Sequence, residues 1–155
     1  MPDPDFPPPS PVPPAGTYIG IDFGLKRIGL ASGNSGTATA MPLTTVANHH
    51  GTPAWAEIDA VIDQWQPVAL VVGRPVQMDG AEQPMTREAD GFARRLRKRY
   101  PLPVFAADER HTSIEAGQIL KHQRRTASRG KTNKADIDRI AAALLLQRWL
   151  ETHFS

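Results

Sequence analysis

The sequence contains no cysteine. Disulfide bridges, zinc sites built on thiolates and thiol nucleophiles are therefore excluded. It also lacks an apolar run close to the ~20 residues of a membrane span, and no basic region followed by an apolar stretch stands at its N-terminus. We therefore expect a cytoplasmic protein that makes no contact with a membrane.

A strong charge imbalance is absent as well, because 18 Lys and Arg residues stand against 16 Asp and Glu residues. The distribution of the cations is more informative than their total. Residues 94–99 contain five cations in six positions, and residues 121–134 contain six cations and no acidic residue. Such clusters are typical either of solvated helix faces or of a surface that binds a polyanion.

The first 16 residues differ from the rest of the chain, since eight of them are prolines. Proline has no amide donor and a fixed φ, so such a segment cannot join a sheet or continue a helix. We expect residues 1–16 to form a disordered, proline-rich tail and residues 17–155 to form a single domain. A chain of 155 residues with 40% hydrophobic content is sufficient for one domain with a real core.

Hydrophobic patterns in the first half of the domain predict an antiparallel meander followed by a helix. The three strands are expected at residues 18–23, 27–32 and 37–46, and Pro42 favours an edge position or an end for the third. Thr52 is a suitable helix N-cap and Pro53 suits the first helical position. Four apolar residues then fall on one helical stripe, which predicts a buried face: Trp55, Ile58, Ile62 and Trp65.

The second half alternates between short apolar runs and amphipathic segments. Residues 68–73 and 104–108 are typical of buried parallel strands, with a helix between them. A capping box at residues 112–115 predicts a further helix, and Asn133 is expected to cap the final one, which runs to near Phe154. The fold class is therefore α/β: a mixed sheet, antiparallel and then parallel, with helices on both faces.

Three acidic residues stand in apolar surroundings. Asp22 follows the apolar strand at 18–21, Glu109 follows the strand at 104–108, and Asp138 stands at the start of the apolar final helix. A carboxylate is costly to bury alone, and three brought together would repel one another unless a divalent cation binds them. Mg²⁺ and Mn²⁺ prefer oxygen ligands, and pairs of such ions promote hydrolysis of phosphodiesters. We therefore predict that these three residues bind Mg²⁺ or Mn²⁺, with two ions expected.

Helix geometry supports Asp138, because residues 138, 142, 145 and 149 share one face and the last three are apolar. Alanines at 141–143 would let this helix lie close to the sheet. Each carboxylate also has a structural interpretation: Asp138 as an acid at a helix N-terminus, Asp22 in a turn, and Glu109 in a surface pair. Asp108 is a rival ligand, since strand alternation puts it and Glu109 on opposite faces.

Four segments resemble the YqgF/RuvX family, whose members are described as Holliday junction resolvases and as nucleases that process the 5′ end of pre-16S rRNA. They occur in the family's order and extend the similarity from Thr17 to the C-terminus. The segments are residues 19–31 (IGIDFGLKRIGLA), 71–80 (VVGRPVQMDG), 108–113 (DERHTS) and 133–138 (NKADID) with the helix that follows.

The resemblance implies a ribonuclease H-like fold with acidic residues at Asp22, Glu109 and Asp138, and it favours Glu109 over Asp108. It also implies contacts with nucleic acid. The candidate residues for these contacts are Lys26, Arg27, Arg74, Arg110, Thr112, Ser113, Arg124, Arg125, Arg129, Lys131 and Lys134.

The expected function is a metal-dependent endonuclease that processes the 5′ end of pre-16S rRNA. Three alternatives stay open: a Holliday junction resolvase acting on branched DNA, a nucleic-acid-binding factor without catalysis, and a phosphotransferase of the actin type. The chain is too short for the two-domain cleft of the last class. A monomer or weak homodimer is expected.

Overall fold

The structure is a computed structural model that describes residues 12–49, 51–75, 79, 81–108 and 134–154. Within these ranges no helix has both the length and the apolar character needed to cross a membrane. The segments predicted as a helix from 112–115 and as a cap at Asn133 lie outside the described residues, as does the tail up to residue 11.

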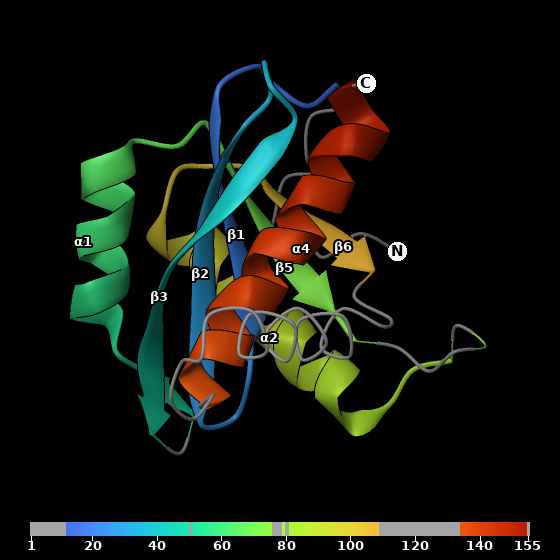
Figure 1. Cartoon of the computed structure of the whole chain (residues 1–155). Helices are drawn as coiled ribbons and strands as arrows, with labels where there is room; N and C mark the ends of the chain where they lie inside the picture. The colour runs from blue at the N-terminus through green and yellow to red at the C-terminus, as the bar shows by residue number, and fades with distance from the viewer. Residues whose placement is uncertain (1–11, 50, 76–78, 80, 109–133, 155) are drawn as a thin grey trace, which may run out of the picture.

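The described residues form a mixed six-stranded sheet with the strand order β4-β3-β2-β1-β5-β6 (Figure 1). The strands on one side of β1 are antiparallel to their neighbours, and β1, β5 and β6 are parallel. This confirms the predicted mixed sheet. The strands are β1 (Thr17–Phe23), β2 (Arg27–Asn34), β3 (Thr39–His49), β4 (Thr52–Pro53), β5 (Ala69–Arg74) and β6 (Val104–Asp108).

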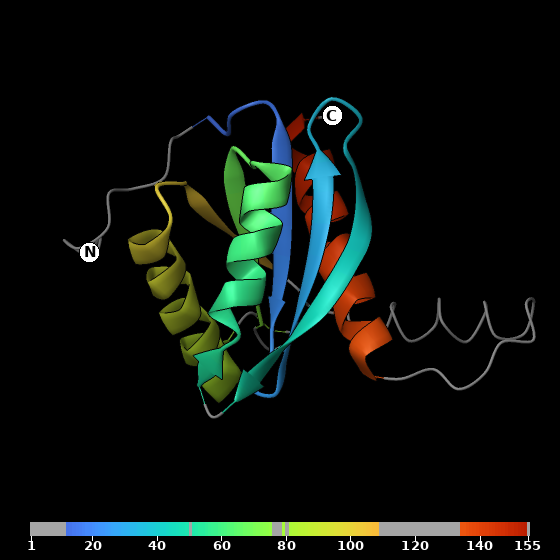
Figure 2. The same ribbon diagram turned by 90° about the vertical axis from the view of Figure 1, so that its left-hand side faces the viewer.

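Helices cover both faces of the sheet, as predicted. Figure 2 shows α1 (Trp55–Trp65) and α2 (Pro84–Arg99) on one face and α4 (Lys134–Phe154) on the other. Each face has its own hydrophobic cluster. Ile19, Ile21 and Phe23 of β1 pack toward α1 and α2, whereas Tyr18 packs toward α4. Side chains of β1 therefore alternate between the two faces.

The prediction that the first helix starts at Thr52 and Pro53 is wrong. These two residues form β4, which pairs with Asn48 and His49 of β3, and the helix is capped at Ala54. The amide of Ala54 also donates to the carbonyl of Ala47 (3.0 Å). Pairing with a strand brought there by the tertiary fold thus overrides the local preference of a Thr-Pro pair for a helix start.

The third strand is longer at its end than predicted, since β3 reaches His49. Pairing with the first residues of β2 extends it, because Arg27 and Ile28 are in register with Ala47 and Val46. Pro42 lies opposite Ala31, next to a register shift, and outside the stretch of β3 that β4 covers. The predicted edge position of this proline is therefore confirmed.

Contacts with the domain begin slightly before Thr17. The Tyr18 hydroxyl donates to the carbonyl of Pro14, and Gly16 exchanges hydrogen bonds with Ser35. Burial raises the pKa of Tyr18 to about 12. Residues 14–16 thus lie against the sheet.

Candidate functional site

Three parallel strands end at one edge of the sheet. Ile21 of β1 is in register with Val72 of β5, which is in register with Ala106 of β6. The carboxyl ends of parallel strands are the usual place for a site in an open α/β sheet. Asp22 and Asp108 both lie at this edge, near the ends of β1 and β6.

Asp22 projects from the face that α4 covers. It follows Tyr18 and Gly20 at the strand period of two, and Tyr18 belongs to the cluster on that face. A Cβ added to Gly20 would lie 2.7 Å from the Cβ of Leu146 in α4. The Asp22 side chain is half-buried on this face.

The first turns of α4 lie directly on β2, beside Asp22. Gly29 is the cross-strand partner of Asp22, and a Cβ added to it would lie 2.1 Å from the carbonyl oxygen of Asp138. Opposite residues of an antiparallel pair share one face of the sheet. The structure therefore places the Asp138 backbone over Gly29, the strand neighbour of Asp22, on the face of the sheet from which Asp22 projects.

Two contacts attach this end of α4 to the sheet. The Nε of Arg27 donates to Oδ2 of Asp138 at 2.7 Å. The hydroxyl of Thr45 on β3 donates to the carbonyl of Ala135 at 2.6 Å. Sequence reasoning missed Thr45, because nothing in its local pattern distinguishes it from other strand threonines.

Asn48 was missed for the same reason. Its side-chain amide donates to the carbonyl of Gly24 (2.8 Å), and its backbone amide donates to the carbonyl of Lys26 (2.9 Å). Both carbonyls belong to the turn between β1 and β2, which carries the chain from Asp22 to Arg27. Asn48 is only 3% exposed, so the turn rests on a buried polar residue.

Asp108, the rival ligand, lies on the other face. Val104 packs toward α1 and α2 whereas Ala107 packs toward α4, and alternation along β6 therefore directs Asp108 away from the α4 face. Asp22 and Asp108 are thus separated by the sheet.

Arg74 follows the same pattern at the end of β5. Its guanidinium donates to both oxygens of Asp90 (3.1 and 3.2 Å) and to Glu82 (2.8 Å). The hydrogen bonds with Asp90 raise the pKa of Arg74 above its usual value. These contacts join β5 to α2, so Arg74 has a structural role in addition to the predicted contact with nucleic acid.

The remaining predicted residues divide into two groups. Lys26 and Lys134 are exposed, one in the β1–β2 turn and one in the first turn of α4. The others lie outside the described residues: Glu109, Arg110, Thr112, Ser113, Arg124, Arg125, Arg129 and Lys131. Within the described ranges, no three His, Asp or Glu side chains gather into a group that suits a metal ion.

The basic run at residues 94–99 lies on α2, on the face of the sheet opposite Asp22. Arg99 donates to both oxygens of Asp59 (2.8 and 2.6 Å), and the guanidiniums of Arg95 and Arg99 lie 5.3 and 4.8 Å from the ring centre of Trp55. These cations cover an aromatic ring of α1, which supports the interpretation of this run as a solvated helix face.

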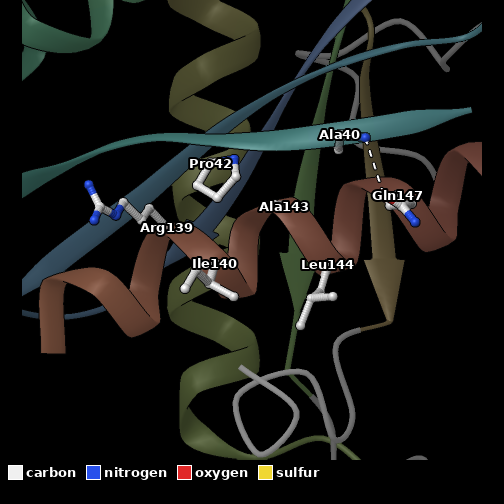
Figure 3. Close-up of a pocket in the computed structure, with 7 residues that line it drawn as sticks. All are labelled: Ala40, Pro42, Arg139, Ile140, Ala143, Leu144 and Gln147. Atoms are coloured by element: carbon white, nitrogen blue, oxygen red, sulfur yellow. Dashed lines mark hydrogen bonds between the residues drawn. The ribbon is translucent and has the colours of Figure 1, made fainter. Parts of the chain in front are cut away.

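A groove of about 430 Å³ lies between β3 and α4 (Figure 3). Arg139, the neighbour of Asp138, stands at one end of it, and Gln147 stands at the other and accepts a hydrogen bond from the amide of Ala40 (3.3 Å). The groove therefore begins next to the candidate site and runs along α4 from Arg139 to Gln147.

Residues 16–152 match the family model described as RuvX, Holliday junction resolvase. This chain belongs to that family. Curated relatives extend the match. A protein of Legionella pneumophila (strain Paris) is 44% identical over 89% of this chain and 97% of its own length, and one of Pseudomonas putida is 44% identical over 87% and 94%. Both carry the name "Putative pre-16S rRNA nuclease".

Solved structures show that this RuvX-family chain has the ribonuclease H-like fold. Thermus thermophilus RuvC in complex with a Holliday junction substrate has a TM-score of 0.54 and 18% identity, covering 89% of this chain and 95% of that one. The yeast mitochondrial Holliday junction resolvase Ydc2 has a TM-score of 0.50 and 12% identity, covering 91% and 80%. The predicted fold class and family are thus confirmed.

Proposed function

We propose that this protein is a divalent-metal-dependent nuclease that hydrolyses phosphodiester bonds of structured nucleic acid, with the 5′ end of pre-16S rRNA as its substrate in the cytoplasm. The observation that carries the proposal is the meeting of Asp22 and the Asp138 turn of α4 across Gly29. The names of the curated relatives supply the substrate.

The donor set suits Mg²⁺ or Mn²⁺, because it consists of carboxylate oxygens from separate rigid elements. Asp22 on β1 and Asp138 on α4 would bind the metal, together with Glu109, whose assignment rests on the sequence. When bound, such ions lower the pKa of a coordinated water and stabilise the charge that develops on the phosphate. The role of the protein would be to orient the carboxylates and to hold them close together on rigid elements.

Exposed cations at the same end suit the nucleic-acid backbone. Lys26 and Lys134 flank the two carboxylates in the chain, and phosphate contacts of this kind make binding weaken with salt. The basic stretch from Arg124 to Lys131 is proposed to extend this surface. Since phosphate contacts carry no base information, recognition of the substrate depends on its shape.

The test is cleavage of a pre-16S rRNA 5′-end fragment with Mn²⁺, with Mg²⁺ and with EDTA. Asp22→Asn is expected to reduce cleavage by on the order of 100-fold or more, because it removes a charged ligand and keeps the shape of the side chain. Asp63→Asn is the matched control, since Asp63 is exposed on α1, on the other face of the sheet. Equal cleavage by the Asp22 and Asp63 variants would refute the metal site.

A second candidate is resolution of branched DNA, which the description of the family model favours. A four-way DNA junction in the same assay separates the two. Preferential cleavage of the junction over the rRNA fragment would assign the protein to DNA. Tight binding of either substrate without cleavage under any metal condition would instead support a binding factor.

A further inference from the structure

The ion pair between Arg27 and Asp138 joins two residues that are 111 positions apart in the chain. The contact runs from Nε of the guanidinium to Oδ2 of the carboxylate at 2.7 Å. The contact is therefore a directional hydrogen bond to one carboxylate oxygen, and not a charge attraction alone. The two side chains are 35% and 21% exposed, so the pair lies at the surface of the site and not in the core.

Both ends of the pair stand on fixed backbone. Arg27 opens β2 and is in register with Ala47 of β3, and the turn before it accepts the two hydrogen bonds from Asn48. Asp138 stands on α4, close against Gly29 and one turn after the Thr45 contact. Because the backbone holds both partners in place, the pair loses little additional freedom when it forms, unlike an ordinary surface pair.

We propose that Arg27 is a positioning residue for the metal site: its Nε fixes the orientation of the Asp138 carboxylate and offsets the repulsion between Asp138 and Asp22. This inference rests on the metal-dependent function proposed above. Groups that orient a metal-binding side chain through a hydrogen bond typically change metal affinity by about 10- to 100-fold.

A positioning role differs from the phosphate contact that the sequence suggests for Arg27. A phosphate contact requires a positive charge near the substrate, and lysine can supply this charge in place of arginine. Orientation of Asp138 requires a donor at the place of Nε, which a lysine ammonium on a flexible stem does not reproduce. Arg27→Lys keeps the positive charge, so the repulsion between this charge and a bound cation stays the same. The substitution therefore isolates the effect of orientation.

The experiment is calorimetric titration of the full chain with Mn²⁺, without nucleic acid. Arg27→Lys and Arg27→Gln are each expected to weaken Mn²⁺ binding by about tenfold or more. Arg87→Lys is the matched control, because it makes the same replacement at an exposed arginine of α2, on the face of the sheet opposite Asp22. It is expected to change the affinity less than about threefold.

The outcomes separate this inference from the proposed function. If the wild type binds Mn²⁺, Asp138→Asn weakens binding and Arg27→Lys leaves it unchanged, the positioning role is overturned and the metal site stands. If the wild type binds no Mn²⁺, both the positioning role of Arg27 and the proposed metal site are overturned. Unfolding midpoints measured in EDTA serve as the fold control, and a loss of affinity in Arg27→Lys protein with a wild-type midpoint supports the proposal.

Discussion

Gly29→Ala is the perturbation that tests the geometry of the site most directly. The new methyl group would lie 2.1 Å from the carbonyl oxygen of Asp138, 2.4 Å from its carbonyl carbon and 2.9 Å from the amide nitrogen of Arg139. All three atoms belong to the helix backbone, so no side-chain rotation relieves the overlap. Either α4 moves away from β2 or the sheet distorts.

The expected cost is at the upper end of the ~1–3 kcal/mol that overpacking of a core usually causes. For a chain of this size, ~3 kcal/mol corresponds to a fall in the unfolding midpoint of roughly 6–12 °C. Moving α4 also separates Asp138 from Asp22, so the Mn²⁺ affinity of the folded variant should fall as well. Urea and thermal unfolding followed by tryptophan fluorescence measure the first effect.

Gly91→Ala is the matched control, because it adds the same methyl group where no atom lies within 4 Å. Gly91 stands inside α2, where replacing glycine by alanine usually stabilises a helix by ~0.5–1 kcal/mol. The two variants should therefore move in opposite directions. A Gly29→Ala protein as stable as the wild type would show that α4 does not lie against β2 as described.

Three further variants test other parts of the structure by urea unfolding. Phe92→Ala should cost ~3–5 kcal/mol, since the ring is 1% exposed and stacks on two aromatic rings; a loss below ~1 kcal/mol would contradict this packing. Asn48→Ala should cost ~1–3 kcal/mol because the β1–β2 turn loses its side-chain donor, and an unchanged midpoint would refute that role. Hydrogen bonds from Arg99 and Tyr100 lower the pKa of Asp59 to about 2, below its usual 3.8. This pair should therefore add stability above about pH 4 and lose it as the pH falls toward 2. Since Asp59 is 41% exposed, the free energy of unfolding of the wild type should exceed that of Asp59→Asn by less than ~1 kcal/mol. If the unfolding free energies of the two proteins depended on pH in the same way, the Asp59 carboxylate would contribute nothing to stability.

Local pattern alone determined most of the elements. The stripe of Trp55, Ile58, Ile62 and Trp65 predicted one buried face of α1, and all four pack against the same cluster. These predictions succeed because a period of 3.6 or 2 depends only on neighbouring residues. The exception is Thr52–Pro53, where pairing with β3 outweighed a local helix signal.

Since carboxylates in apolar surroundings need a physical reason, the sequence by itself also singled out Asp22, Glu109 and Asp138, of which Glu109 lies outside the described residues. It could not decide what surrounds them. The contact of Asp138 with Arg27, the approach of α4 to Gly29 and the support from Thr45 and Asn48 join residues from separate strands and a distant helix. Such contacts depend on how the elements pack in space, and no spacing along the chain encodes them. For the same reason only the tertiary structure separated Asp108 from Asp22, because the face that each side chain takes is set by the sheet and by the helix that covers it.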